Sequence, residues 1–194
     1  MPRNSKSTTG RARSKSSTKS AAPYNEESKL KELFVEELKD IYWAEKHLTK
    51  ALPELQKAVT TPKLQDAFES HLGQTMDHVT RLEQVFEIIG EKPIAKKCEA
   101  MEGLTKEADS IVDETEEGTM TRDAAVIMAA QKVEHYEIAT YGGLVQYAEL
   151  LGYDDAAELL QTTLNEEKET DKSLTVIAEN DINWQAEQET DEDE

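Results

Sequence analysis

Two glutamates, Glu134 and Glu137, could do chemistry because they fall where a buried helix face normally carries apolar side chains. They lie in the stretch 123–151, whose apolar residues recur every three or four positions, the spacing of a helix with one buried face. An ionised carboxylate in that position is costly unless it is paired, protonated or bound to a metal ion. The two glutamates therefore need partners elsewhere in the chain.

Three other stretches of helical spacing also carry metal-capable side chains near their midpoints. These side chains are Glu45, His71, His78, Glu167 and Asp171. If four helices pack side by side with neighbours antiparallel, all seven groups come to one level of the bundle. Five carboxylates and two imidazoles without a thiolate suit two divalent first-row ions, iron or manganese, with some carboxylates bridging.

Such a ligand set indicates a particular reactivity. Fe(II) pairs held by carboxylates and imidazoles react with dioxygen or peroxide when the protein supplies open coordination positions and a dry shell. We expect Glu45, Glu134, Glu137 and Glu167 to be the catalytic members of the set. A single glutamate or histidine on an apolar face is more often an edge residue or a hydrogen-bonded core residue. The coincidence on four helices favours the metal site.

The same spacing predicts the first pair of helices. Ser28 is a plausible cap for a helix that reaches Leu55, although Pro53 should kink it or end its regular part. Thr61 followed by Pro62 predicts the start of the second helix, which Gly90 ends.

A second helical pair follows a long connection. Residues 90–121 contain a weaker amphipathic pattern, which predicts a crossover with a short helix in it. The helix of residues 123–151 ends at Gly152, and Asp154 or Asp155 should cap the last helix, whose stripe reaches Ile177. The sequence thus predicts an all-α, ferritin-like four-helix bundle with one long crossover between its second and third helices.

Charge divides the chain into three parts. The 194 residues carry a net charge of -19, yet residues 1–25 hold six of the 22 basic residues and no acidic one. We expect residues 1–27 to be a basic, serine-rich disordered tail, 28–180 the bundle domain and 181–194 an acidic tail. The acidic body should raise the local concentration of cations.

The basic tail suggests a possible partner. A flexible cationic arm can bind nucleic acid by neutralising phosphates, and without aromatic residues such binding would be non-specific. A tail that only solubilises the protein or folds back on the acidic body fits equally well. No apolar run is long enough to span a bilayer, so we expect a cytoplasmic protein that makes no membrane contact.

Several strings in this chain resemble the bacterial, stress-associated YciE/YciF family, which belongs to the ferritin-like superfamily. The resemblance extends from Leu30 to about Glu179. Its motifs are Asp40–Glu45, His78–Phe86, Cys98–Gly103, Val133–Ile138 and Glu166–Asp171. The string Val-Glu-His-Tyr-Glu-Ile at 133–138 is the most specific of them.

The resemblance implies a homodimeric four-helix bundle with a dimetal centre of two iron ions per chain and ferroxidase activity. Fe(II) and dioxygen or peroxide would be its substrates. The superfamily pattern expects Glu-x-x-His on two helices, and this sequence contains no such tetrad. Gln74 stands where relatives would often carry a glutamate, and a neutral amide there weakens one metal position.

Some assignments stay open. His71 could hold a ligand carboxylate instead of the metal, and Glu166 could take the place of Glu167 if the helix register differs by one. We expect His47 and His135 to face water. The three tyrosines near the site could relay electrons or hydrogen-bond a ligand, although core packing is the more common role; they are Tyr42, Tyr136 and Tyr141. Two other functions remain possible: a non-catalytic stress or interaction protein with a degraded metal site, and a nucleic-acid-associated protector that acts through its tail.

Overall fold

The computed structural model describes residues 28–190, so the predicted basic tail (1–27) and the last four residues of the acidic tail (191–194) lie outside it. The described part is helical and contains no strand. Its elements are α1 (Lys29–Ala58), α2 (Pro62–Ile89), α3 (Glu99–Glu114), α4 (Met120–Leu151), α5 (Asp154–Ile177), a π-helical turn (Ala178–Ile182) and α6 (Asn183–Gln188). None of these helices of residues 28–190 combines the length and the apolar character of a membrane span.

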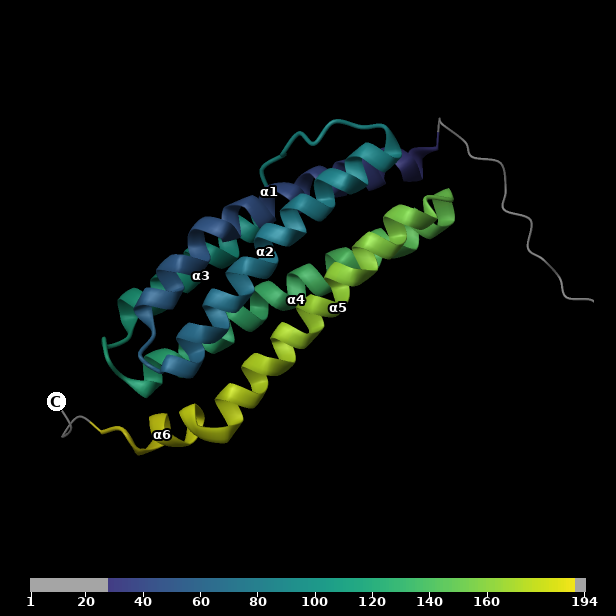
Figure 1. Ribbon diagram of the computed structural model, residues 1–194. Helices are drawn as coiled ribbons and strands as arrows, with labels where there is room; N and C mark the ends of the chain where they lie inside the picture. Colours follow the sequence, from purple (N-terminus) through teal and green to yellow (C-terminus); the bar gives the residue numbers. More distant parts are fainter. Residues whose placement is uncertain (1–27, 191–194) are drawn as a thin grey trace, which may run out of the picture.

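The long helices pair as two hairpins. α1 packs on α2 and α4 on α5, and Figure 1 shows the two hairpins lying against each other along the long axis of the molecule. α3 lies in the crossover between α2 and α4, and it contacts α4 and α1. This is the predicted ferritin-like bundle with one long connection. Apolar side chains from all four long helices fill most of its interior.

Pro53 lies inside α1, which continues to Ala58. Of the two effects predicted for Pro53, an end of the regular helix just before it is therefore wrong. Leu52 and Leu55, on either side of Pro53, are both buried against the core. Tertiary packing of this apolar face outweighs the backbone hydrogen bond that proline removes.

The start of α2 depends on a residue of α4. The buried carboxylate of Asp123 accepts hydrogen bonds from the backbone amides of Thr60 and Thr61, each at 2.8 Å. Thr61 makes no side-chain cap hydrogen bond itself. α4 begins at Met120, earlier than predicted, because Thr119 Oγ1 accepts from the Arg122 amide at 3.1 Å. The first turn of α4 thus also fixes the beginning of α2.

The turn between α4 and α5 contains Gly152, whose φ of 78° is in the left-handed region that favours glycine. Tyr153 occupies the cap position of α5, and its side chain makes no cap hydrogen bond. The prediction that Asp154 or Asp155 is the cap is wrong by one or two residues. Both aspartates instead lie in the first turn, where the positive end of the helix dipole favours negative charge.

The predicted acidic tail begins too early in the chain. The boundary at residue 181 falls inside the π-helical turn, and Ile182 is 1% exposed. α6 follows, and the carboxylate of Glu189 accepts from the backbone amides of Met120 at 2.6 Å and Thr121 at 2.8 Å. Glu189 therefore caps α4, and the folded part extends at least to this residue.

Candidate metal centre

Six of the seven predicted ligands lie buried at the middle of the bundle. None of them is more than 4% exposed, and together they come from all four long helices. They are Glu45 on α1, His71 and His78 on α2, Glu134 and Glu137 on α4, and Glu167 on α5. Each interrupts the apolar stripe of its own helix, which is why packing of the stripes brings the six together.

A first group consists of Glu45, His78 and Glu167. His78 Nδ1 lies 3.0 Å from Glu167 Oε1 and 3.5 Å from Glu45 Oε1. One ligand atom from each of the three residues lies within 4.8 Å of the others. Two carboxylates and one imidazole therefore face a single point between α1, α2 and α5.

A second group shares Glu167 with the first. It consists of His71, Glu134, Glu137 and Glu167, again with ligand atoms within 4.8 Å of one another. His71 Nε2 lies 3.2 Å from Glu134 Oε1. Since Glu167 belongs to both groups, it is the carboxylate that could bridge two cations.

Most carboxylate oxygens of these groups have no hydrogen-bond partner. The unpartnered buried atoms include Glu45 Oε2, Glu134 Oε2 and both oxygens of Glu137 and of Glu167. A buried polar atom without a partner costs about 1–3 kcal/mol, and more when it is charged. Six orphaned oxygens around two points is the arrangement that a pair of cations would satisfy, so the donor set fits two divalent metal ions.

The pKa values of these groups are shifted because the groups are buried close to one another. Burial, followed by the charge of Glu167, raises the pKa of both Glu134 and Glu137 well above the usual carboxyl value. Burial also raises the pKa of Glu45. For His78, burial opposes protonation, but the neighbouring carboxylates of Glu167 and Glu45 outweigh it and raise the pKa to about 10. The metal-free centre therefore holds protons that cations would displace.

The outward-facing nitrogen of His78 is held by Glu166. His78 Nε2 lies 2.9 Å from Glu166 Oε2, and Arg81 donates to the same oxygen at 2.8 Å and to Thr163 Oγ1 at 2.6 Å. Glu166 is therefore not exchanged with Glu167: it contacts the ring from the outside, while Glu167 faces the interior. This arrangement orients the imidazole with Nδ1 directed into the first group.

The three tyrosines do more than pack. Tyr141 is fully buried and donates a short hydrogen bond to Glu45 Oε1. Tyr42 donates to Glu83 Oε1 at 2.7 Å, and Tyr136 donates to Asp40 Oδ2 at 2.8 Å. Core packing is confirmed for Tyr42 and Tyr141, which are buried, and each of the three hydroxyls also has a carboxylate acceptor. Of the three, Tyr141 contacts a residue of the candidate centre.

Asp171 is not brought into either group. Its carboxylate accepts from Gln131 Nε2 at 3.0 Å and lies 3.3 Å from His135 Nε2, at the seam between α4 and α5. His135 faces water as predicted, with 69% of its side chain exposed. His47 does not: it is half-buried, stacks on Trp43 and lies 2.9 Å from Thr105 Oγ1.

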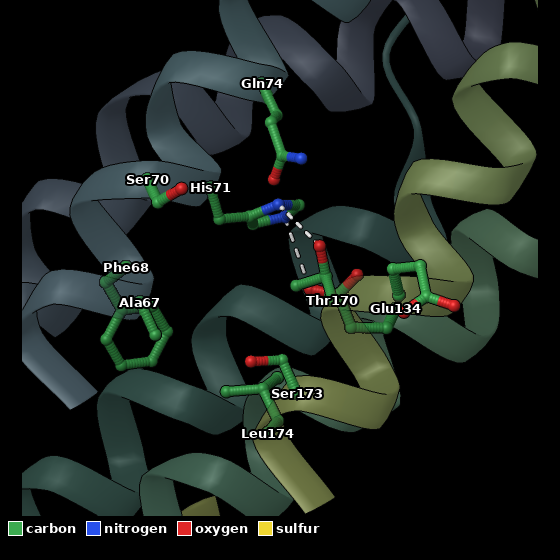
Figure 2. A pocket seen from close by; sticks show the side chains of 10 residues that line it. Ala67, Phe68, Ser70, His71, Gln74, Glu134, Thr170, Ser173 and Leu174 are labelled. Atoms are coloured by element: carbon green, nitrogen blue, oxygen red, sulfur yellow. Dashed lines mark hydrogen bonds and ion pairs between the residues drawn. The ribbon is translucent and has the colours of Figure 1, made fainter. Parts of the chain in front are cut away.

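A polar pocket of about 200 Å³ reaches the centre from the surface between α2 and α5. It extends from Glu169, whose side chain is 75% exposed, to the buried Glu134. Figure 2 shows the ring of His71 in contact with Glu134 and Thr170, with the amide of Gln74 directed toward it. Gln74 thus lines this pocket. The sequence predicts in addition that its neutral amide weakens one metal position.

Four helices, one long crossover and a buried carboxylate–histidine cluster together define a ferritin-like helical bundle. A family model, described as a domain of unknown function (DUF892), matches residues 29–187. The chain therefore belongs to the DUF892 family, which here coincides with the YciE/YciF type that its motifs indicate. Protein YciF of Escherichia coli K12 is 49% identical over 159 residues, or 81% of this chain and 95% of YciF.

Solved structures agree with this assignment. The crystal structure of the E. coli stress protein YciF has a TM-score of 0.77 and 48% identity, covering 80% of this chain and 98% of that one. The structure of YcfI from Rhodopseudomonas palustris has a TM-score of 0.74 and 43% identity, covering 77% and 95%. A Xanthomonas campestris protein with 22% identity and a TM-score of 0.63, covering 82% and 97%, shares the fold.

Proposed function

We propose that this protein binds two Fe(II) ions at the centre of its bundle and oxidises them with dioxygen or hydrogen peroxide. The observation that carries the proposal is the set of buried carboxylate oxygens without partners, contributed by four glutamates. Two divalent ions would bring four positive charges, which balance these four carboxylates. Carboxylate and imidazole ligands suit iron, and manganese would fit the same donors.

The two groups divide the ligands between two ions. Glu45 and His78 would hold one ion, His71 would hold the other with Glu134 and Glu137, and Glu167 would bridge them. In the balanced reaction, two Fe(II), one dioxygen and two protons give two Fe(III) and one hydrogen peroxide. With peroxide as oxidant, two Fe(II), one hydrogen peroxide and two protons give two Fe(III) and two water molecules.

The residues of the chain would bind the cations and hold the ligand side chains in position. The apolar layers around the cluster exclude bulk water, which strengthens the attraction between carboxylates and cations. Glu166 and Arg81 fix the ring of His78, and the hydroxyl of Tyr141 holds Glu45. The polar pocket beside Gln74 offers a hydrated cation a path to Glu134. These features support a site that is organised before the cations arrive.

A role in stress protection follows from the reaction proposed. E. coli YciF is described as a stress protein, and consumption of Fe(II) with an oxidant limits damaging radical chemistry. We include in the proposal the homodimer and the cytoplasmic location expected from the sequence.

An iron oxidation assay tests this function. Purified protein, loaded anaerobically with Fe(II) and then exposed to oxygen, should form Fe(III) faster than buffer does, and Glu134→Ala should lose most of that acceleration. Glu149→Ala is the matched control, because Glu149 is an exposed glutamate on the same helix. Equal rates for wild type and Glu134→Ala would contradict the proposed oxidation activity and favour a non-catalytic stress protein.

A further inference from the structure

A second and smaller cavity reaches Glu134 from another side of the bundle. It lies between α1, α3 and α4, and its volume is about 20 Å³. Most of its lining is aliphatic. The main contributors are Leu48, Leu52 and Leu55 of α1, Ala108 of α3, and Ala130 and Val133 of α4. Glu134 therefore lines both this cavity and the polar pocket of Figure 2.

The polar atoms around the cavity offer little to a water molecule. Thr105 Oγ1 already donates to Met101 O at 3.0 Å and lies 2.9 Å from His47 Nε2. Asp109 is exposed, so it marks the outer end of the cavity. Among the lining residues, the buried polar atom without a partner is Glu134 Oε2. A water molecule needs two to four polar partners, whereas an apolar cavity of this kind stays dry and accepts apolar guests.

We infer that this cavity binds dioxygen and delivers it to the Glu134 side of the metal centre. The inference rests on the proposed function and specifies its oxidant. Dioxygen is an apolar diatomic molecule of suitable size for a single dry cavity, whereas hydrogen peroxide and hydrated Fe(II) need hydrogen-bonding walls. The polar pocket between α2 and α5 provides such walls through Ser70, Gln74 and Ser173. Cation and oxidant thus approach by separate routes.

One substitution fills the cavity without replacing a ligand. Ala130 is 5% exposed and lies one helical turn before Glu134, so leucine at this position occupies the space in front of the carboxylate. Ala157→Leu is the matched control. Ala157 is also 5% exposed, borders a separate surface hollow, and lies about 15 Å along α5 from Glu167 at the helical rise.

Xenon binding tests the cavity without iron. Xenon is an apolar probe, and crystals of the wild-type protein under xenon pressure should show a xenon atom among Leu52, Ala130 and Val133. The Ala130→Leu protein should show none, while Ala157→Leu should keep it. Absence of xenon from the wild-type cavity overturns the inference, and this measurement does not depend on the folding of any variant.

Oxidation kinetics test delivery of the oxidant. Ala130→Leu should raise the KM for dioxygen on the order of tenfold while the rate with hydrogen peroxide stays near that of wild type. Ala157→Leu should change neither. An unchanged KM for dioxygen in Ala130→Leu contradicts the inference even if xenon binds. If wild type takes up no iron, the proposed function fails instead, whatever xenon does.

Discussion

Glu167 Oε1 lies 3.0 Å from His78 Nδ1, at the centre of the bundle. The other nitrogen of the same ring, Nε2, lies 2.9 Å from Glu166 Oε2, so two consecutive residues of α5 hold the two sides of one imidazole. With the proton on Nε2 facing Glu166, Nδ1 can carry the free lone pair that binds an incoming cation. The half-exposed carboxylate of Glu166 thereby helps to set the orientation of the His78 ring in the buried site.

Removing Glu166 should therefore weaken metal binding although Glu166 is not a ligand. Loss of such an outer partner typically lowers metal affinity about 10- to 100-fold. We expect this loss for Glu166→Ala in a competition titration of Fe(II) or Mn(II) against a chelator. Glu158→Ala, at an exposed position of the same helix, is the control and should bind as wild type does. Wild-type affinity in Glu166→Ala would show that Glu166 does not position His78.

Glu137 should destabilise the metal-free protein as pH rises. Its pKa in the folded state is raised by burial and then by the charge of Glu167, so folding favours the protonated form. Below the ordinary carboxyl pKa, Glu137 is protonated in the folded and the unfolded protein, and its burial costs least. As the pH rises from there toward the folded-state pKa, the folded protein loses stability. Glu137→Gln removes this titration and should be more stable than wild type by about 1–4 kcal/mol at pH 8, and by less at pH 5.

Urea unfolding of the metal-free proteins at both pH values measures this difference. The lowered pKa of His71 acts in the opposite direction, but it is common to both proteins and cancels in the comparison. Glu149→Gln, an exposed change on α4, should show no pH-dependent difference from wild type. A Glu137→Gln protein that is less stable than wild type at pH 8 would mean that the glutamate has a partner other than a cation.

Asp123 should contribute to stability through the backbone of another helix. Asp123→Ala leaves the amides of Thr60 and Thr61 without their acceptor in a partly buried turn. We expect a loss of about 2–4 kcal/mol in the free energy of unfolding. Chemical denaturation measures it, with Asp113→Ala at an exposed position as control. A loss no larger than that of the control would show that α2 starts without this carboxylate.

The basic segment 1–25 should retain DNA in a salt-dependent way if it acts as a nucleic-acid arm. It carries six of the 22 basic residues and no acid, so each phosphate contact releases a counterion. Gel retardation at increasing salt should show binding by the full chain that weakens steeply, and no binding by a chain that lacks residues 1–25. Equal retention of both chains would exclude the arm.

The periodicity of apolar residues was sufficient to predict the bundle and most of its centre. Each long helix has a polar interruption of its apolar stripe at mid-length, and stripes must face the core. Glu45, His78 and Glu137 therefore lie where the pattern places them. This prediction succeeds because burial of ionisable side chains without compensation is too costly to occur on four helices by coincidence.

Asp171 shows where the same reasoning stops. Four residues advance a helix by about 400°, so Asp171 is turned about 40° from Glu167 around α5. That rotation is enough to move it from the interior to the α4 seam, where Gln131 and His135 contact it. Spacing alone does not distinguish the two positions. The position of Asp171 is determined by its partners across the seam, which belong to a different helix.

Contacts between distant segments account for the remaining differences. Glu189 is part of an acidic run that reads as a solvated tail, yet its carboxylate caps α4. Pro53 predicts a helix end, yet the core packing of its neighbours keeps α1 continuous. Local composition describes what a segment prefers in isolation, and these two residues are governed by tertiary contacts.

The count of bound iron tests the central claim most directly. Protein loaded anaerobically with excess Fe(II), freed of unbound metal and measured by elemental analysis should contain close to two irons per chain. Glu167→Ala, which removes the shared carboxylate, should contain fewer than one. A wild-type protein that retains no iron, or as much as Glu167→Ala does, would contradict the dimetal centre.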